Sequence, residues 1–142
     1  MEQENDFIKR EIQKLAMVLS KLIDKTASSS TNNFEAFTFE TNEKLKEYFD
    51  ISLNEIATIE NSKLIDKVEN FHEKHLEKLI ELIYQTIQKS EEFEVEFDFE
   101  IKELSKKLLQ MIDFANNKTN LFSIERMNMK KQIEATLKPN NY

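Results

Sequence analysis

The chain has 142 residues, no cysteine, no glycine and a single proline, and its formal net charge at pH 7 is -7. This length suits one domain with a buried core. The missing glycine excludes glycine-rich phosphate loops, dinucleotide fingerprints and nucleophile elbows, which all need a sharply bent backbone. The negative charge repels nucleic acid as a whole, and no apolar run approaches the ~20 residues that span a bilayer. We therefore expect neither nucleic acid nor a membrane as a partner.

The first predicted element is an amphipathic helix of about five turns. Its apolar residues recur at steps of three and four positions, namely Ile8, Ile12, Leu15, Leu19, Leu22 and Ile23. The helix is expected to stop near Lys25, because residues 26–33 offer no apolar anchor, and we expect a flexible linker there. The residues before it, Met1 to Asp6, are acidic where a secretory signal is basic, so we expect a cytoplasmic protein.

Three aromatic residues follow the linker: Phe34, Phe37 and Phe39. We expect these rings to lie across the helices and to cover the core, because rings this close together need something to pack on. A short helix is predicted from Thr41 to about Phe49. The next helix begins at Ser52, because Ser52 and Glu55 have the spacing of a capping box.

The longest apolar stripe predicts one continuous helix from Lys63 to Lys89, about 40 Å long. Asn61 and Ser62 precede it and are suited to cap its first turn. We expect this helix to be the one against which the others pack.

Both histidines, His72 and His75, lie on this predicted helix. Glu69 and His72 have the Glu-x-x-His spacing of di-iron bundles, but the chain has no histidine for a second such pair. A mononuclear metal site remains open, formed by His72, His75 and a carboxylate such as Glu69. The structural alternative is that His75, between Phe71 and Leu79, is a half-buried ring with one satisfied nitrogen.

Acidic and apolar residues alternate strictly between Glu92 and Ile101, which is the period of a half-buried strand. The same residues also continue a helical stripe that begins at Phe93. We favour a helix from about Phe99 to Asn116, preceded by irregular or extended residues. A strand here would need residues 36–39 as its partner.

This stretch also carries the candidate partner-binding residues, Phe93, Phe97 and Phe99. Interleaved with acids between Glu91 and Glu103, these rings are suited to dock a basic or amphipathic partner. That interpretation requires at least one of them to be exposed in the monomer. The alternative is that all three rings complete the core.

The last helix is predicted to begin at Ser123, stapled by Phe122 onto Met127, and to reach Pro139, after which residues 139–142 fray. It carries a small basic face made of Arg126, Lys130 and Lys131. Such a face suits an anion, although the overall charge opposes nucleic acid and cations are expected near a helix C-terminus.

Covalent catalysis has little basis in this sequence. There is no cysteine, and the serines cluster in the linker or at helix caps. Carboxylates are too abundant for any one pair to indicate a glycosidase. We therefore expect no enzyme and no cofactor.

Four segments of the sequence carry a resemblance: residues 5–10, 48–56, 76–84 and 122–126. With them the chain resembles an uncharacterised family of small bacterial all-helical proteins, whose C-terminal half is similar to a degenerate tetratricopeptide-type helical hairpin. The resemblance implies a binding surface and no catalysis. No functional residue carries over from it.

Together these observations predict an all-α, single-domain bundle of five or six helices over residues 1–142. The resemblance implies that its C-terminal half is tetratricopeptide-like. The expected function is non-catalytic protein–protein interaction, with an unidentified protein partner or a second copy of the chain. The competing hypothesis is a small metal- or ligand-binding bundle that uses His72 and His75.

Overall fold

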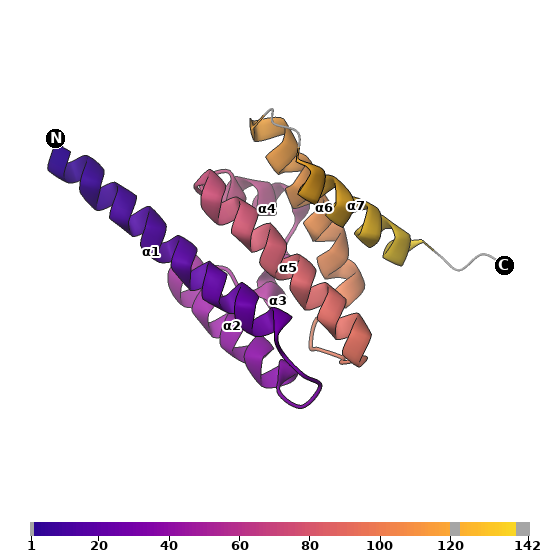
Figure 1. Cartoon of the computed structure of the whole chain (residues 1–142). Coiled ribbons are helices and arrows are strands. Elements are labelled where there is room, and N and C mark those ends of the chain that lie inside the picture. The colour runs from indigo at the N-terminus through magenta and orange to yellow at the C-terminus, as the bar shows by residue number, and fades with distance from the viewer. Residues whose placement is uncertain (1, 120–122, 139–142) are drawn as a thin grey trace.

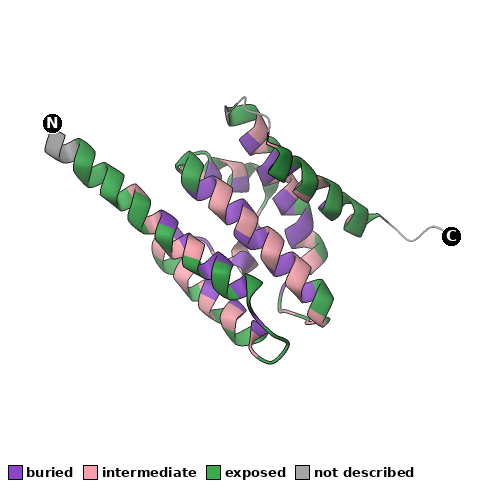
Figure 2. Ribbon diagram, in the orientation of Figure 1, coloured by how far each residue is buried: buried purple, intermediate pink, exposed green. Residues whose placement is uncertain are grey.

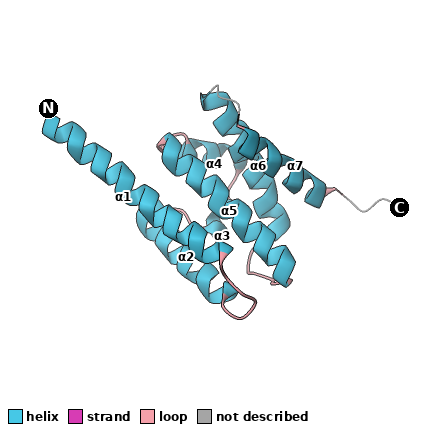
Figure 3. Ribbon diagram, viewed as in Figure 1, coloured by secondary structure: helices cyan, strands magenta, loops and turns pink. Residues whose placement is uncertain are grey.

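The computed structural model describes residues 2–119 and 123–138. Within these residues every regular element is a helix (Figures 1 and 3). The helices are α1 (Glu2–Ala27), α2 (Phe34–Phe49), α3 (Leu53–Thr58), α4 (Asn61–Val68), α5 (Glu73–Phe93), α6 (Ile101–Thr119) and α7 (Ile124–Leu137). The all-α prediction is confirmed, and the described residues form seven helices where five or six were expected.

The helix α5 lies at the centre of the bundle, between α1 and α6 (Figure 1). Both neighbours pack along it. On the outside of the bundle, α2 packs on α1 and α7 packs on α6. The buried side chains of α5 form one broad face of the helix, and half-buried residues lie on the other side (Figure 2). Its fully buried apolar residues include Leu79, Ile80, Leu82, Ile83 and Ile87. The expectation that a long helix organises the core holds for α5.

The predicted continuous helix from Lys63 to Lys89 is wrong, because the helix is interrupted between the end of α4 at Val68 and the start of α5 at Glu73. The Asn70 amide donates to the backbone oxygen of Asp66, and His72 Nδ1 accepts from the backbone N–H of Lys74 at 3.1 Å. His72 thus caps α5 as Asn or Asp commonly does. The apolar period continues across the break because both helices turn their apolar faces to one core.

Polar contacts shape the connection between α1 and α2, where a flexible linker was expected. Thr26 and Ser29 are buried, and the Ser29 hydroxyl donates to the Thr26 backbone oxygen at 2.6 Å. The Asn33 side chain accepts from the backbone N–H of Ser30 at 2.8 Å. The helix α2 begins at Phe34, earlier than the predicted Thr41.

The three aromatic residues after this connection have different environments. Phe34 is fully buried, Phe37 is half-buried, and Phe39 is 67% exposed. They lie on α2 at different angles about its axis, so only Phe34 faces the core. The prediction that these rings cover the core holds for Phe34 and fails for Phe39.

Two helices end in a left-handed residue that is usually glycine. Because the chain has no glycine, Asp50 at φ 59° and Glu94 at φ 53° take this conformation after α2 and α5. Asp50 is paired with Lys67 and Lys46. The turn at Glu94 leads the chain into residues 94–100, which run back to α6.

Residues 94–100 form neither a helix nor a strand, as favoured from the sequence. The helix α5 continues to Phe93, and α6 begins at Ile101 and ends at Thr119. The alternative strand is wrong, because its only candidate partner, residues 36–39, lies within α2.

The predicted capping box at the start of α3 is confirmed. The Ser52 hydroxyl accepts from the Glu55 backbone N–H, and the Glu55 carboxylate accepts from the Ser52 backbone N–H, both at 3.2 Å. The predicted cap at Ser123 is also confirmed, because its hydroxyl accepts from the Arg126 backbone N–H. The staple expected from Phe122 and the frayed tail at 139–142 lie outside the described residues.

We expect Glu55→Gln to lower the free energy of unfolding at neutral pH by about 0.5 kcal/mol. The hydrogen bond from Lys46, followed by those from Ser52, lowers the pKa of Glu55. A lowered pKa in the folded state stabilises the protein above the unfolded pKa of about 4.3, and this contribution is lost as the pH falls through the folded pKa. Urea denaturation of the wild type and the variant, at neutral pH and below about pH 4, measures the loss of unfolding free energy with Glu55 ionised and with Glu55 protonated. A loss that is equal in both would show that the charge of Glu55 contributes nothing.

Candidate acidic groove

An open groove lies between α2 and residues 94–100, with the start of α3 at one end. Its volume is about 770 Å³. We call it the acidic groove, after the side chains of Glu35, Phe39, Glu43, Glu47, Glu96 and Asp98 that line it. All six of these residues are exposed.

One face of α2 forms the longer side of the acidic groove. Glu35, Phe39, Glu43 and Glu47 follow one another at steps of four residues. Residues four apart on a helix lie nearly above one another, so these side chains form a row about 18 Å long. Phe39 is therefore an exposed ring with carboxylates on both sides.

The opposite side of the acidic groove contains two of the aromatic residues that the sequence suggested as partner-binding. Phe97 and Phe99 stack with ring centroids 5.2 Å apart, and both line the groove. Phe99 is only 6% exposed. Phe93 and Phe97 are half-buried and meet the ring of Phe34 edge-on at 5.6 and 5.7 Å.

The three candidate partner-binding rings differ in exposure, and their role in binding stays a prediction. None of Phe93, Phe97 and Phe99 is an exposed ring, and Phe99 belongs to the core. The acids of the same stretch, Glu96 and Asp98, do line the groove. The exposed ring is Phe39, which the sequence analysis placed over the core. The four-residue spacing from Glu35 to Glu47 was the signal that indicates this face.

Hydrogen bonds fix the floor of the groove. The Asn42 amide nitrogen donates to Asn54 Oδ1 at 2.9 Å, and Asn42 Oδ1 accepts from the Leu53 backbone N–H at 2.8 Å. One asparagine thus ties α2 to the first turn of α3. Both helices are also packed on the core, through Leu45 of α2 and Leu53 of α3 among others.

The charge of the acidic groove is left largely uncompensated. Lys46 lines the groove too, but its ammonium pairs with Glu55 at 3.0 Å and with Asp50 at 3.6 Å. The hydrogen bond to Glu55 raises the pKa of Lys46. The five groove carboxylates form no ion pair within the described part of the chain. A cationic partner would therefore meet carboxylates that have no competing protein cation.

The two histidines have structural contacts. His75 is buried, and its Nε2 lies 2.8 Å from the backbone oxygen of Ile12; because a carbonyl only accepts, Nε2 is the donor. The His75 ring also meets Phe49 edge-on at 5.6 Å. This placement agrees with the structural alternative for His75.

The predicted metal ligands are not assembled into a site in the described residues. The rings of His72 and His75 lie 5.6 Å apart, but Glu69 belongs to the end of α4, across the helix break. Over residues 2–119 and 123–138, no group of three or more potential ligands is placed to hold a metal ion. The Glu-x-x-His spacing places two ligands on one helix face only within a continuous helix, and Glu69 and His72 lie on either side of the break.

The basic face predicted on α7 is used for packing. Arg126 is 4% exposed, forms an ion pair with Glu77 of α5, and donates from Nε to Asn116 Oδ1 at 2.7 Å. Burial lowers the pKa of Arg126. Lys130 pairs with Asp113 at 3.0 Å, while Lys131 is exposed. These contacts hold α7 against α5 and α6.

Among the described residues no helix combines the length and the apolar character that crossing a membrane requires. No family model matches the chain, and no curated protein or solved structure matches it. The geometry and charge of the acidic groove are therefore the features of the molecule that indicate a function.

Proposed function

We propose that the chain is a non-catalytic protein-interaction module that binds a basic amphipathic helix in the acidic groove. The observation that carries this proposal is the exposed ring of Phe39, set among five carboxylates without ion-pair partners in the described structure. An exposed aromatic residue within a charged rim is the usual composition of a binding surface.

The dimensions of the acidic groove suit a helical ligand. A row about 18 Å long matches roughly three helical turns of a partner. Apolar residues of that partner would pack on Phe39 and the edge of Phe97, and lysine or arginine residues on either side would pair with Glu43, Glu47 and Asp98. Complementary charge gives such a complex fast association and a marked dependence on salt.

The chemistry of the groove supports binding in preference to catalysis. Its acids are exposed, and the Ser52 hydroxyl already accepts from the backbone as the cap of α3. The resemblance to small helical proteins with a tetratricopeptide-like hairpin also implies binding, and we extend it to α6 and α7, which pack on each other. The cytoplasm is the location that we propose with this function.

A designed peptide tests the proposal directly. The probe is a fluorescein-labelled amphipathic peptide of leucine and lysine, about 14 residues or ~21 Å long as a helix, titrated with the intact protein at low salt. We expect saturable binding, weakened at least ~5-fold by Phe39→Ala and by Glu47→Lys.

A matched substitution controls for net charge. Glu134→Lys changes the charge by the same amount as Glu47→Lys, on an exposed face of α7 away from the groove. It is expected to leave peptide affinity within ~2-fold of the wild type. Equal loss in both variants would show that the peptide responds only to overall charge, and no saturable binding would overturn the proposed function.

A further inference from the structure

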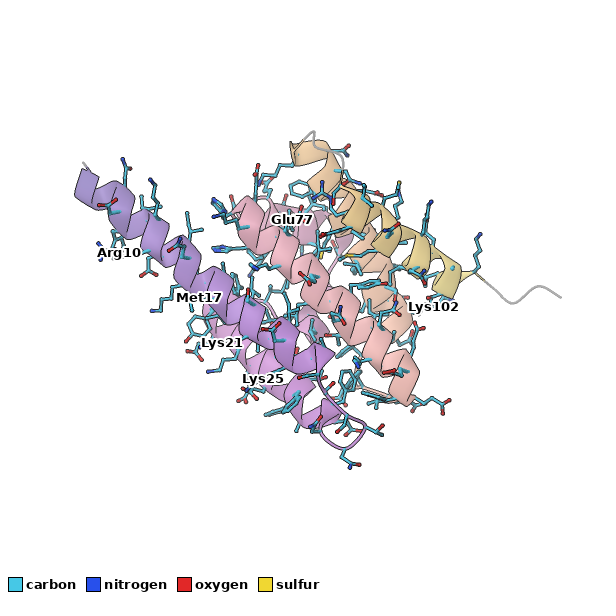
Figure 4. The ribbon with its side chains drawn as sticks, in the orientation of Figure 1. Arg10, Met17, Lys21, Lys25, Glu77 and Lys102 are labelled. Atoms are coloured by element: carbon cyan, nitrogen blue, oxygen red, sulfur yellow. The ribbon has the colours of Figure 1, made fainter. Side chains whose placement is uncertain are left out.

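The helix α1 carries a second exposed surface, opposite in charge to the acidic groove. Six residues at steps of three and four form one face, which we call the basic stripe: Phe7, Arg10, Lys14, Met17, Lys21 and Lys25. All six are exposed, and Figure 4 shows Arg10, Met17, Lys21 and Lys25 along one side of α1. The basic stripe therefore combines four cations with two large apolar side chains and no acid.

Apart from Lys25, the residues of the basic stripe are not what packs α1 on the other helices. The helix α1 packs on α5 through other residues, including Leu19, Leu22 and Ile23. Its N-terminal part projects beyond the other helices and is exposed on all sides (Figures 1 and 2). The Lys14 and Lys21 ammonium groups form no ion pair among the described residues, and Lys25 pairs with Glu40 at 2.8 Å.

The basic stripe and the acidic groove do not meet within one chain. The pair between Lys25 and Glu40 marks the side of α2 that faces α1. Glu43 and Glu47 lie on the side of α2 that faces residues 94–100. Among the described residues no ion pair joins a cation of the basic stripe to a carboxylate of the acidic groove.

We propose that the partner of the acidic groove is a second copy of this chain, whose basic stripe docks there. This inference rests on the proposed function, because it names the occupant of the same groove. Both surfaces are rows on helices: the groove row on α2 is about 18 Å long, and the stripe from Arg10 to Lys25 is about 22 Å long. Phe7 or Met17 of one copy would pack against Phe39 of the other, with lysines beside glutamates.

The contact is reciprocal, which favours a closed dimer. Each copy carries one basic stripe and one acidic groove, so two copies related by a two-fold axis can form the same contact twice. Charge complementarity also explains how a protein of net charge -7 can associate with itself. Repulsion between the two copies as a whole is outweighed by the local attraction of opposite surfaces at short range.

A charge exchange between two full-length variants tests the inference. Variant one carries Lys14→Glu and Lys21→Glu, and variant two carries Glu43→Lys and Glu47→Lys. Sedimentation equilibrium at low salt is expected to show a wild-type dimer, and each variant alone is expected to dissociate ~30-fold more readily. An equimolar mixture of the two variants is expected to form a heterodimer, because both contacts then pair opposite charges again.

A control variant and the peptide titration separate the possible results. Lys63→Glu with Lys102→Glu makes the same charge change as variant one on exposed residues of α4 and α6, and is expected to leave the dimer intact. A monomeric wild type that still binds the leucine–lysine peptide would overturn the self-docking inference and leave the proposed function standing. A monomer that does not bind the peptide would overturn both.

Two further results would also overturn the inference. A dimer whose dissociation is the same in all variants would have another interface. A wild-type monomer that binds phosphatidylserine vesicles or polyuridylate, and loses this binding in variant one, would give the basic stripe a lipid or nucleic-acid ligand instead.

Discussion

Phe34→Ala is expected to lower the free energy of unfolding by about 3–5 kcal/mol. The Phe34 ring is fully buried at the start of α2, where it meets the rings of Phe93 and Phe97 edge-on. Alanine would remove the apolar surface and leave a cavity between α2, the end of α5 and residues 94–100. Such a loss is a large part of the total stability of a domain, typically about 5–15 kcal/mol. Urea denaturation followed by circular dichroism measures it.

The same substitution is expected to weaken the acidic groove at a distance. Phe34 is absent from the groove lining, but it supports Phe97, which lines the groove and stacks on Phe99. With Phe34 gone, residues 94–100 lose the contact that fixes their distance from α2. We expect the affinity of Phe34→Ala for the leucine–lysine peptide to fall even where the protein remains folded.

Phe39→Ala is the matched control, with the same change of residue on the same helix. Phe39 is exposed, so its loss is expected to change stability by less than about 0.5 kcal/mol while it weakens peptide binding. The two variants thus separate support of the groove from contact with a ligand. Equal stability of Phe34→Ala and Phe39→Ala would contradict the packing described for α2.

Helices, caps and the fold class followed from local signals in the sequence. The capping box at Ser52 and the cap at Ser123 depend on contacts within four residues, so their spacing alone predicts them. The apolar stripes of α1 and α6 were likewise visible as a period close to 3.6 residues. These features are set by neighbouring residues and do not depend on the tertiary structure of the rest of the chain.

Some helix boundaries depend on side chains that bond to backbone groups or on contacts distant in sequence, and these could not be predicted in this way. The apolar stripe continues from α4 into α5, and only the hydrogen bonds of Asn70 and His72 show the break between them. At α2 the early start depends on burial of Phe34 against Phe93 and Phe97, which are about sixty residues away in sequence. A contact of that range gives no local pattern.

The acidic groove could be predicted only in part. The sequence indicated acids and rings between Glu91 and Glu103, and Glu96 and Asp98 from that stretch do line it. It could not show which rings are exposed. Phe39, expected to cover the core, is exposed, and Phe99, a candidate for partner binding, is buried. Apolar character predicts burial for both, and only the tertiary structure distinguishes them.

Ile83→Ala is expected to lower the free energy of unfolding by about 4 kcal/mol. Ile83 is fully buried on α5, the helix that packs on both α1 and α6. Three methylene or methyl groups are lost there, and helices held from two sides have little freedom to close the cavity. Ile83→Val removes one such group and is expected to cost about 1 kcal/mol. The series can be measured by urea denaturation at one pH.

Ile8→Ala provides the contrast, because it makes the same chemical change at a residue that is 54% exposed. Ile8 lies one turn before Ile12, whose backbone oxygen is contacted by His75 in the first turn of α5, so we expect its replacement to change stability by less than about 0.5 kcal/mol. Its angle about α1 is that of the core-facing residues, and it is exposed only because α5 does not extend that far. A loss at Ile8 as large as that at Ile83 would mean that the projecting part of α1 is covered in solution. Repeating the measurement across protein concentration would then show whether a second copy covers it, because the stability of a dimer rises with concentration.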